Sequence, residues 1–245
     1  LDINNTDKIS IFQQELVRMN IKLVPPSINQ SNSYFSREGE KISYALGAIK
    51  NVGIESMNDL VNERNSNGIF KNFSDFIQRC NTSIINKKTL EALACAGAFD
   101  EFSVNRASVF NQAQEIVKFH KTQNNKMTSE QEDMFGDIEL SHFSLVDDEE
   151  WNYSYKLMKE YEMLGFYLTG HPLETHQKNY PSLMLKEYLD IKENESAYNQ
   201  KDVLLGGTLL SKKEKRSARG NAYAFLNFSD LSSIYELIVF ESNLR

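Results

Sequence analysis

Apolar residues follow a helical spacing over most of the chain and alternate with polar residues only near its end. Residues 8–19 carry large apolar side chains three or four positions apart, and Pro25 and Pro26 prevent this helix from continuing. Between residues 36 and 115 the pattern predicts several short helices separated by Gly, Asn or Ser, at YALGAI, ESMNDLVNER, FSDFIQRC, KKTLEALACAG and RASVFNQAQEIVKFH. We expect the first helix to be the end of a domain that starts earlier.

The second half of the chain changes its pattern twice. Residues 121–130 predict a loose helix at most, and residues 130–150 hold nine Asp or Glu and no Lys or Arg, which is typical of a flexible linker. A helix is expected from about Asn152 to Gly170, with Pro172 beyond it and His171 on the surface near the negative end of the helix dipole. From Lys201 onward, partial alternation predicts consecutive antiparallel strands of an incomplete barrel, at DVLLGGTLLSKK, NAYAFLNFSDL and IYELIVFES.

These elements predict a mainly α fold with a partial antiparallel β domain at its end. The 245 residues, 40% hydrophobic and 25% charged, suffice for two or more small domains. No apolar run reaches the ~20 residues that a membrane helix needs, and the first residues do not resemble an export signal, so we expect a cytoplasmic protein without membrane contact. Cys80 and Cys95 are too few for a disulfide framework and lack His neighbours for zinc, so both are expected to be core thiols.

Two segments have the pattern of a helix-hairpin-helix. In AIKNVGIESMNDLVNER, a hairpin that ends at Gly53 leads into a helix whose first backbone amides can bind a phosphate without reading a base. The segment LEALACAGAFDEFSVNRASVF repeats the pattern. A single pair of helices joined in this way more often serves only to pack the fold. Two such pairs in tandem make phosphate binding a stronger expectation. The residues expected to contact duplex DNA are Gly47, Lys50, Asn51, Gly53, Lys87, Lys88, Gly97 and Arg106.

The net charge of −7 is distributed unevenly. Residues 36–115 hold nine Lys or Arg against ten Asp or Glu, so any DNA contact there should be local. Residues 201–220 hold six basic and two acidic residues, a net charge of +4, and their stretch KKEKRSARGN falls between two predicted strands. A basic loop with Tyr223 and Phe225 beside it suits single-stranded DNA, whereas the alternative is a solvated hairpin tip. The candidate residues are Lys212, Lys213, Lys215, Arg216 and Arg219.

No catalytic residue and no metal site is predicted. The sequence has no Asp-x-Asp pair, no Gly-rich phosphate loop of the Walker type and no His/Cys cluster. The four carboxylates at residues 147–150 directly precede a predicted helix at Trp151. We expect them to form a solvated charge run rather than a metal site.

Several stretches together resemble one family, the alpha subunit of bacterial DNA polymerase III, which is the C-family replicative polymerase. They are YALGAIKNVG, INKKTLEALACAGAFDEF, QEDMFG and EYEMLGFYLTGHPLE, in this order and at similar spacing. The resemblance covers nearly the whole chain. One departure concerns the first hairpin, where the family commonly has Gly-x-Gly and this chain has Asn51, Val52 and Gly53. Because Asn is the next-best residue for a left-handed conformation, we expect the turn to survive.

The resemblance implies a domain order. Residues 1–35, which include a PP-x-x-N-x-S stretch, would end the fingers domain, and residues 36–115 would form a tandem helix-hairpin-helix region that grips duplex DNA. Residues 116–150 would be a linker, residues 151–198 a helical connector, and residues 199–245 the first part of an OB-fold domain near the single-stranded template.

The resemblance also implies partners. In this family the linker carries the motif that docks into the sliding clamp. Gln131 would hydrogen-bond at the mouth of the clamp pocket, Met134 and Phe135 would fill it, and Asp133 would shape the peptide. The family's catalytic Asp residues, which hold Mg²⁺, lie in a palm domain outside this chain. We therefore expect an inactive piece of a DNA polymerase, without a cofactor of its own, that binds DNA, the clamp and other replicase subunits.

Two rival functions stay open. A helix-hairpin-helix repair enzyme, a glycosylase or nuclease, would need a catalytic Lys or Asp after the hairpin and a pocket for a flipped base, and Asp100 is the one candidate. A helical protein-interaction module would not bind DNA at all.

Overall fold

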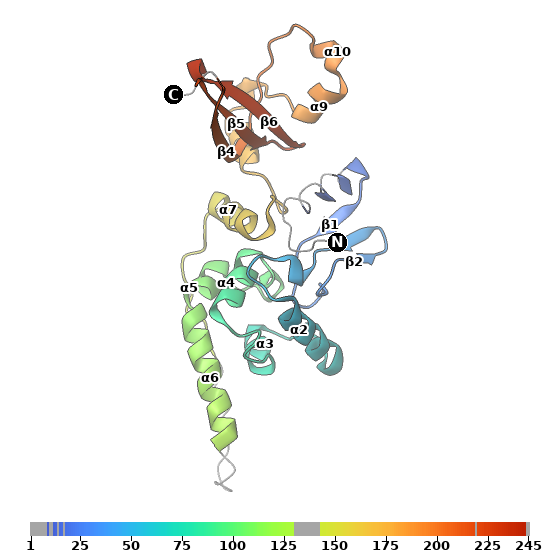
Figure 1. Cartoon of the computed structure of the whole chain (residues 1–245). Coiled ribbons are helices and arrows are strands. Elements are labelled where there is room, and N and C mark those ends of the chain that lie inside the picture. The colour runs from blue at the N-terminus through green and yellow to red at the C-terminus, as the bar shows by residue number, and fades with distance from the viewer. Residues whose placement is uncertain are drawn as a thin grey trace. The chain divides into compact units, whose positions relative to one another are not determined.

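The structure is a computed structural model of the chain. It describes residues 18–129, 143–218 and 220–243, together with five residues nearer the N-terminus, Ile9, Phe12, Gln13, Glu15 and Leu16. The chain divides into two compact units, Leu1–Thr169 and Gly170–Arg245. Figure 1 shows both, and each is described by itself.

In the first unit a small sheet follows a helical segment. The described residues between Ile9 and Arg18 are helical, as expected. Strand β1 (Lys22–Val24) then pairs in parallel with β3 (Lys41–Ser43), and β2 (Ser36–Glu38) pairs antiparallel with β3. Strands of three residues are too short to give an alternating pattern, which is why the sequence did not predict this sheet.

Helices make up the rest of the first unit, and most of them begin where the sequence placed them. An asparagine side chain caps α3, α4, α5 and α7 by accepting a hydrogen bond from the third amide of each helix. The elements are η1 (Leu46–Ala48), α2 (Ile54–Asn67), α3 (Phe73–Arg79), α4 (Lys87–Cys95), η2 (Asp100–Phe102), α5 (Arg106–Asn111), α6 (Ala113–Ser129) and α7 (Tyr153–Leu164). The segment YALGAI, predicted as a short helix, is a single 3-10 turn.

An aromatic cluster lies at the centre of this unit. Phe99 is buried and meets both Phe73 and Phe76 edge-on, with ring centroids 5.1 Å apart in each pair. Cys80 and Cys95 are buried thiols, which confirms the prediction. Burial raises the pKa of Cys95 to about 12. Both thiols therefore act as small apolar side chains at neutral pH.

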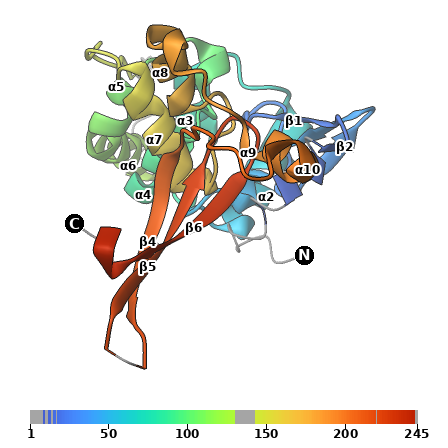
Figure 2. The same ribbon diagram turned by 90° about the horizontal axis from the view of Figure 1, so that it is seen from above.

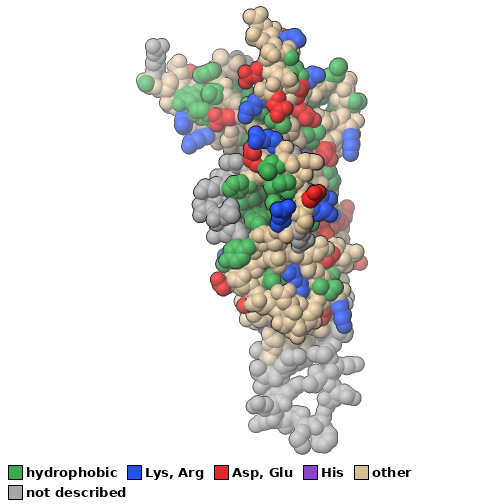
Figure 3. All heavy atoms as spheres, turned by 90° about the vertical axis from the view of Figure 1, so that its right-hand side faces the viewer, with side chains coloured by type: hydrophobic (Ala, Val, Ile, Leu, Met, Phe, Trp, Pro, Cys, Tyr) green, Lys and Arg blue, Asp and Glu red, His purple; other side chains and the backbone are tan. Residues whose placement is uncertain are grey.

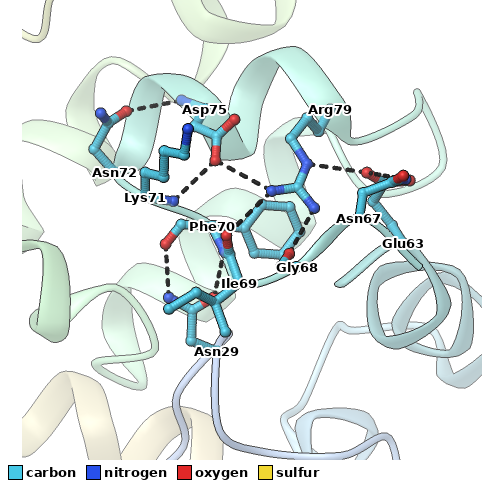
Figure 4. A network of polar contacts seen from close by, with 10 residues as sticks. All are labelled: Asn29, Glu63, Asn67, Gly68, Ile69, Phe70, Lys71, Asn72, Asp75 and Arg79. Atoms are coloured by element: carbon cyan, nitrogen blue, oxygen red, sulfur yellow. Dashed lines mark hydrogen bonds and ion pairs between the residues drawn. The ribbon is translucent and has the colours of Figure 1, made fainter. Parts of the chain in front are cut away.

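The PP-x-x-N-x-S stretch is part of the same packed body. Ile28 is fully buried in the main core, and the buried Arg64 donates to the carbonyls of Ile28 and Ser31, at 2.9 Å in both cases. In Figure 4 the side chain of Asn29 pairs with the backbone of Phe70. Residues 27–35, part of the range 1–35 that we expected to form the end of the fingers domain, therefore pack with the hairpin region that follows them.

The Arg79 side chain contacts several residues of the loop that follows α2. Its guanidinium stacks on Phe70, with Cζ 4.5 Å from the ring centroid, and pairs with Glu63 and Asp75 (Figure 4). It also donates to the carbonyls of Gly68 and Ile69. The Arg79 side chain thus donates hydrogen bonds to two loop carbonyls that lie outside the hydrogen-bond ladder of a helix.

The structure describes residues 116–129 and 143–150 of the region predicted as a linker. The expected helix RASVFNQAQEIVKFH divides at Gln112 into α5 and α6, and α6 extends to Ser129, which is further than its polar sequence predicted. Figure 1 shows α6 projecting from the other helices of this unit. Its first turns are anchored by buried Ile116 and His120. Residues 143–150, here called the acidic strap, pack against α5 and α6.

Helix α7 ends earlier than predicted. Its C-cap is Gly165, with φ +86°, and not Gly170. Glu160 explains the loop beyond it: this fully buried carboxylate accepts hydrogen bonds from the backbone amides of Leu168 and Thr169 and from the Thr169 hydroxyl, at 2.7 to 2.9 Å. The division between the two units falls directly after Thr169, inside the range 151–198 that we expected to form one connector.

The second unit combines short helices with a three-stranded sheet. Its helical elements are α8 (Pro172–Asn179), η3 (Pro181–Leu183), α9 (Tyr188–Glu193), α10 (Glu195–Tyr198) and η4 (Glu241–Asn243). The strands β4 (Thr208–Arg216), β5 (Ala222–Ser229) and β6 (Ile234–Phe240) are consecutive and antiparallel, as predicted, and Figure 2 shows β4 and β5 as a long hairpin. The mainly α fold with a partial antiparallel β region is confirmed.

His171 does not lie on the surface as predicted. It is buried and forms the N-cap of α8, where Nδ1 accepts from the Leu173 amide at 3.1 Å and Glu174 completes a capping box. Its Nε2 lies 2.9 Å from the Ser229 hydroxyl, which joins α8 to the sheet. Burial lowers the pKa of His171 below its usual range. Over the described ranges, no helix is long and apolar enough to cross a membrane.

Candidate nucleic-acid interface

The first hairpin, residues 46–67, joins η1 to α2 through an exposed turn. Asn51 lies at its tip with φ +67°, so the expected left-handed conformation at this residue is confirmed. Lys50 is exposed beside it, and its backbone N–H donates to the Met163 carbonyl of α7 at 3.0 Å. The tip is thus held by a helix more than a hundred positions further along the chain.

Helix α2 begins without a side-chain cap. Its N-cap is Gly53, exposed and in an extended conformation with φ −79°, and the Gly53 carbonyl accepts from the Met57 amide at 3.1 Å. Since the first amides of a helix have no acceptor within it, those of residues 54–56 are available to an anion at the positive end of the helix dipole. This start differs from α3, α4, α5 and α7, whose asparagine caps fill that position.

Gly47, predicted to contact DNA, lies inside the hairpin. It is buried and donates to the Ser33 carbonyl at 3.1 Å. A Cβ at this residue would lie 2.7 Å from that carbonyl oxygen and would also overlap the Ile54 side chain. The glycine therefore permits close packing of the hairpin on the segment just after the PP-x-x-N-x-S stretch and presents no surface to a phosphate.

Two lysines from other elements approach the first hairpin. Lys88 of α4 and Lys159 of α7 line, together with Asn51, a cavity of about 240 Å³. The Lys159 ammonium pairs with Glu162 at 2.9 Å, which raises the pKa of Lys159, and lies 5.3 Å from the Tyr155 ring centroid. Lys159 was not among the predicted DNA contacts, because only the packing of α7 places it in this cavity. Lys87 does not line this cavity itself, and its Nζ lies 3.7 Å from Glu91, which does.

The second hairpin, residues 87–111, is built around an internal ion pair. Gly97 is buried with φ +76°, and a Cβ there would lie 2.7 Å from Cζ of Arg106. The Arg106 side chain is only 9% exposed and bonds to Asp100 through Nε at 2.8 Å. We expected Gly97 and Arg106 to contact DNA. Instead, Arg106 points inward and Gly97 makes room for it.

The acidic strap lies along the second hairpin. The Glu150 carboxylate accepts from the backbone amides of Arg106 at 3.2 Å and Ala107 at 3.4 Å, and pairs with Lys156 at 3.0 Å. Burial opposes its charge, but the hydrogen bonds from Lys156, Trp151 and Arg106 together hold the pKa of Glu150 below its usual range. The four carboxylates of residues 147–150 are therefore not one solvated run: residues 147 and 149 are exposed, and residues 148 and 150 are bound.

Asp100, the catalytic candidate of the rival repair enzyme, is engaged by Arg106. It lines an open cavity of about 360 Å³ with Ser103, Val104, Asn105, Glu150 and Lys156. This lining offers no aromatic ring on which a flipped base could stack. Within the ranges that the structure describes, no group of three His, Cys, Asp or Glu could hold a metal ion.

The basic residues near the C-terminus lie on strand β4 and not in a loop. Register pairs Lys213 with Phe225 and Lys215 with Tyr223, so these side chains share one face of the sheet. Lys215 Nζ lies 4.9 Å from the Phe225 ring centroid. Lys212 and Arg216 point to the opposite face, where Lys212 pairs with Glu214 at 2.7 Å. Arg219 and the clamp-binding candidates lie outside the described residues: Gln131, Asp133, Met134 and Phe135.

Comparison with known proteins agrees with this geometry. Residues 20–109 match the family model of the helix-hairpin-helix motif, a range that covers the PP-x-x-N-x-S stretch, the first hairpin and all but the last two residues of the second. Over 99% of its length the chain is 34% identical to DNA polymerase III subunit alpha of Campylobacter jejuni, and over its whole length it is 34% identical to that of Caulobacter vibrioides.

The chain belongs to the family of DNA polymerase III alpha subunits. A third relative, from Borreliella burgdorferi, is 32% identical over 98% of the chain. The chain spans about a fifth of the length of these relatives, 20% of the first and 21% of the other two. The similarity is therefore to one segment of these longer relatives.

Proposed function

We propose that this chain is the part of a replicative DNA polymerase alpha subunit that holds duplex DNA, and that the first hairpin makes the contact. The observation that carries the proposal is the start of α2, where uncapped amides follow the exposed left-handed Asn51. Amides and a helix dipole bind a phosphate of any sequence, as a replicative polymerase requires.

The charge around the hairpin favours a local contact. Lys50 and Lys88 are exposed, whereas the surrounding range 36–115 is nearly neutral. Figure 3 shows basic and acidic side chains mixed on the face that it presents. A few phosphates next to the hairpin, and not a long stretch of backbone, would then be bound.

The test is fluorescence anisotropy of a labelled duplex, titrated with the chain at several salt concentrations. Each phosphate contact contributes about −0.9 to the slope of log affinity against log salt. Lys50→Ala and Lys88→Ala should each weaken binding and reduce the steepness of the slope by about one. Lys71→Ala is the matched control, because Lys71 is exposed on the loop before α3. Equal losses in all three variants would show non-specific attraction and contradict the proposal.

We further propose that Gln131, Asp133, Met134 and Phe135 bind the sliding clamp. The support is the sequence QEDMF in a chain of this family. Burying Met134 and Phe135 could contribute about 1.5 to 3 kcal/mol each, from which the ordering of the peptide subtracts, so binding should be about micromolar. Titration with the clamp of the same organism tests this. A Met134→Ala/Phe135→Ala variant that binds as well as the parent would refute it.

We also propose that residues outside this chain carry out the chemistry of the parent polymerase. The chain by itself should not extend a primer, with or without Mg²⁺, because we identify no carboxylate set for nucleotidyl transfer in it. A primer-extension assay checks this. Cleavage of damaged duplex DNA that disappears in Asp100→Asn would instead establish the rival repair enzyme.

A further inference from the structure

The two hairpins differ in what occupies them. The first presents an exposed tip at Asn51 and a helix start at Gly53 without a side-chain cap. In the second, Asn105 caps α5 and the Glu150 carboxylate takes the amides of Arg106 and Ala107. The amides at the start of α2 in the first hairpin could bind a phosphate. In the second hairpin, the equivalent amides at the start of α5 are already bound by a carboxylate of the chain itself.

The strap that carries Glu150 is anchored independently of that carboxylate. Gln112 bonds to both backbone groups of Val146, donating from Nε2 at 2.6 Å and accepting at Oε1 at 3.0 Å. The Asp148 amide donates to the buried Ser108 hydroxyl at 2.9 Å, and its carbonyl accepts from Asn105 at 2.7 Å. Bonds to the strap backbone do not depend on ionisation, so they hold the segment in place whatever the charge of residue 150.

The charges near the second hairpin also disfavour phosphate. Arg106, which could have attracted it, is neutralised by Asp100 and turned inward. Lys156 is paired with Glu150. The Asp100 side chain is 51% exposed, and Glu149 is exposed on the strap. A phosphate placed at the second hairpin would lie near carboxylates. Among the described residues, the one cation that lines the cavity, Lys156, is already paired.

We propose that Glu150 and the acidic strap close the second hairpin to DNA, so that duplex DNA is held at the first hairpin alone. This inference rests on the proposed duplex binding and specifies which of two similar hairpins carries it. Although the sequence contains a tandem pair, the chain makes one phosphate-binding hairpin and uses the other as a structural support.

A matched pair of substitutions at the two tips tests the asymmetry. Asn51 and Ser103 are both exposed and both left-handed, with φ +67° and +55°. Asn51→Asp and Ser103→Asp therefore add the same charge at equivalent places. We expect Asn51→Asp to weaken duplex binding roughly tenfold at low salt and Ser103→Asp to leave it unchanged within about twofold. Equal weakening by both, a larger effect of Ser103→Asp, or no effect of either would overturn the proposal.

Amide hydrogen exchange tests the closure without DNA. In the parent chain the amides of Arg106 and Ala107 should be protected, and in Glu150→Ala they should exchange at least about tenfold faster. Glu149→Ala removes the same charge one residue away and should leave both amides protected. Fast exchange in the parent, or unchanged protection in Glu150→Ala, would overturn the proposed closure.

The two measurements separate this inference from the function on which it rests. If the parent chain does not bind duplex DNA even at low salt, the proposed function fails, and the exchange rates still decide whether Glu150 occupies the second hairpin. If the parent binds duplex DNA and Ser103→Asp weakens that binding as much as Asn51→Asp, the function stands and the assignment to one hairpin fails.

Discussion

The side-chain amide of Asn29 pairs with the backbone of Phe70 in both directions. Its Nδ2 donates to the Phe70 carbonyl and its Oδ1 accepts from the Phe70 N–H, each at 2.8 Å (Figure 4). Phe70 in turn lies under the Arg79 guanidinium. One asparagine thus joins the segment before the hairpins to the loop between α2 and α3.

Asn29→Ala should destabilise the first unit. The change removes both hydrogen bonds and leaves two backbone groups of a buried residue without partners, which costs about 2 to 4 kcal/mol at about 1 to 2 kcal/mol for each group. Urea unfolding followed by far-UV circular dichroism measures the loss. Gln30→Ala is the control, since Gln30 is exposed beside Asn29. Equal stability of the two variants would show that the Asn29–Phe70 pair contributes little.

Alanine should separate the roles of two hairpin glycines. Gly47→Ala places a methyl group against the Ser33 carbonyl and Ile54, so overpacking should destabilise the first unit by about 1 to 3 kcal/mol. Gly53→Ala meets only the Ser56 hydroxyl, at an ordinary 3.4 Å, and φ −79° suits alanine. Thermal unfolding should therefore be nearly unchanged in Gly53→Ala. A large loss there, or none in Gly47→Ala, would contradict this assignment.

Acidification should destabilise the first unit through His120. This side chain is buried on α6, with Nε2 2.8 Å from the Cys80 carbonyl and, among the residues that the structure describes, no hydrogen-bond partner at Nδ1. Burial lowers the pKa of His120 in the folded state, so the unfolded chain takes up a proton first. The stabilisation is complete above the unfolded pKa of about 6.5 and decreases as the pH falls below it towards the folded value.

Unfolding free energies at pH 7.5 and pH 5 measure this effect. His120→Gln should lower the stability at pH 7.5, because it disrupts packing, and should reduce the difference between the two pH values. His176→Gln, at an exposed position of α8, should leave that difference unchanged. A parent chain with the same stability at both pH values would exclude His120 as a significant contributor.

Single-stranded DNA should prefer one face of the C-terminal sheet. Lys213 and Lys215 share a face with Tyr223 and Phe225, whereas Lys212 and Arg216 share the opposite face with Glu214. Because stacking and charge act together on single strands, Lys213→Ala/Lys215→Ala should weaken binding of a labelled oligothymidine by roughly tenfold. Lys212→Ala/Arg216→Ala removes the same charge from the other face and should cost less. Equal losses would indicate charge attraction alone.

The local sequence was sufficient where nearby residues determine the structure. Helices α3 and α4 begin next to the asparagines that cap them, and the strands β4 to β6 follow from alternating residues separated by turns. The left-handed turn at Asn51 was predictable because few other residues adopt that conformation. The family resemblance was likewise carried by contiguous stretches of sequence.

Predictions based on neighbouring residues were wrong where a contact outside the local pattern determines the structure. A basic residue after a hairpin predicted a phosphate contact at Arg106, but Asp100 and the space above Gly97 turn it inward. A glycine followed by a proline predicted the end of a helix at Gly170, but Gly165 ends α7 earlier and His171 begins a new helix. The acidic composition predicted a solvated linker, although the strap has partners on α5.

By itself the sequence determined most helices of the first unit, the strands β4 to β6, the two hairpins and the family, because these depend on spacing, caps and turn residues within a few positions of each other. Only the tertiary structure decided which hairpin remains open. The Glu150 carboxylate reaches the amides of Arg106 and Ala107 across more than forty positions of sequence. Lys159 likewise lines the same cavity as Asn51 only because α7 packs there. Hydrogen bonds and ion pairs of this range depend on the folded core, and no local pattern of residue types encodes them.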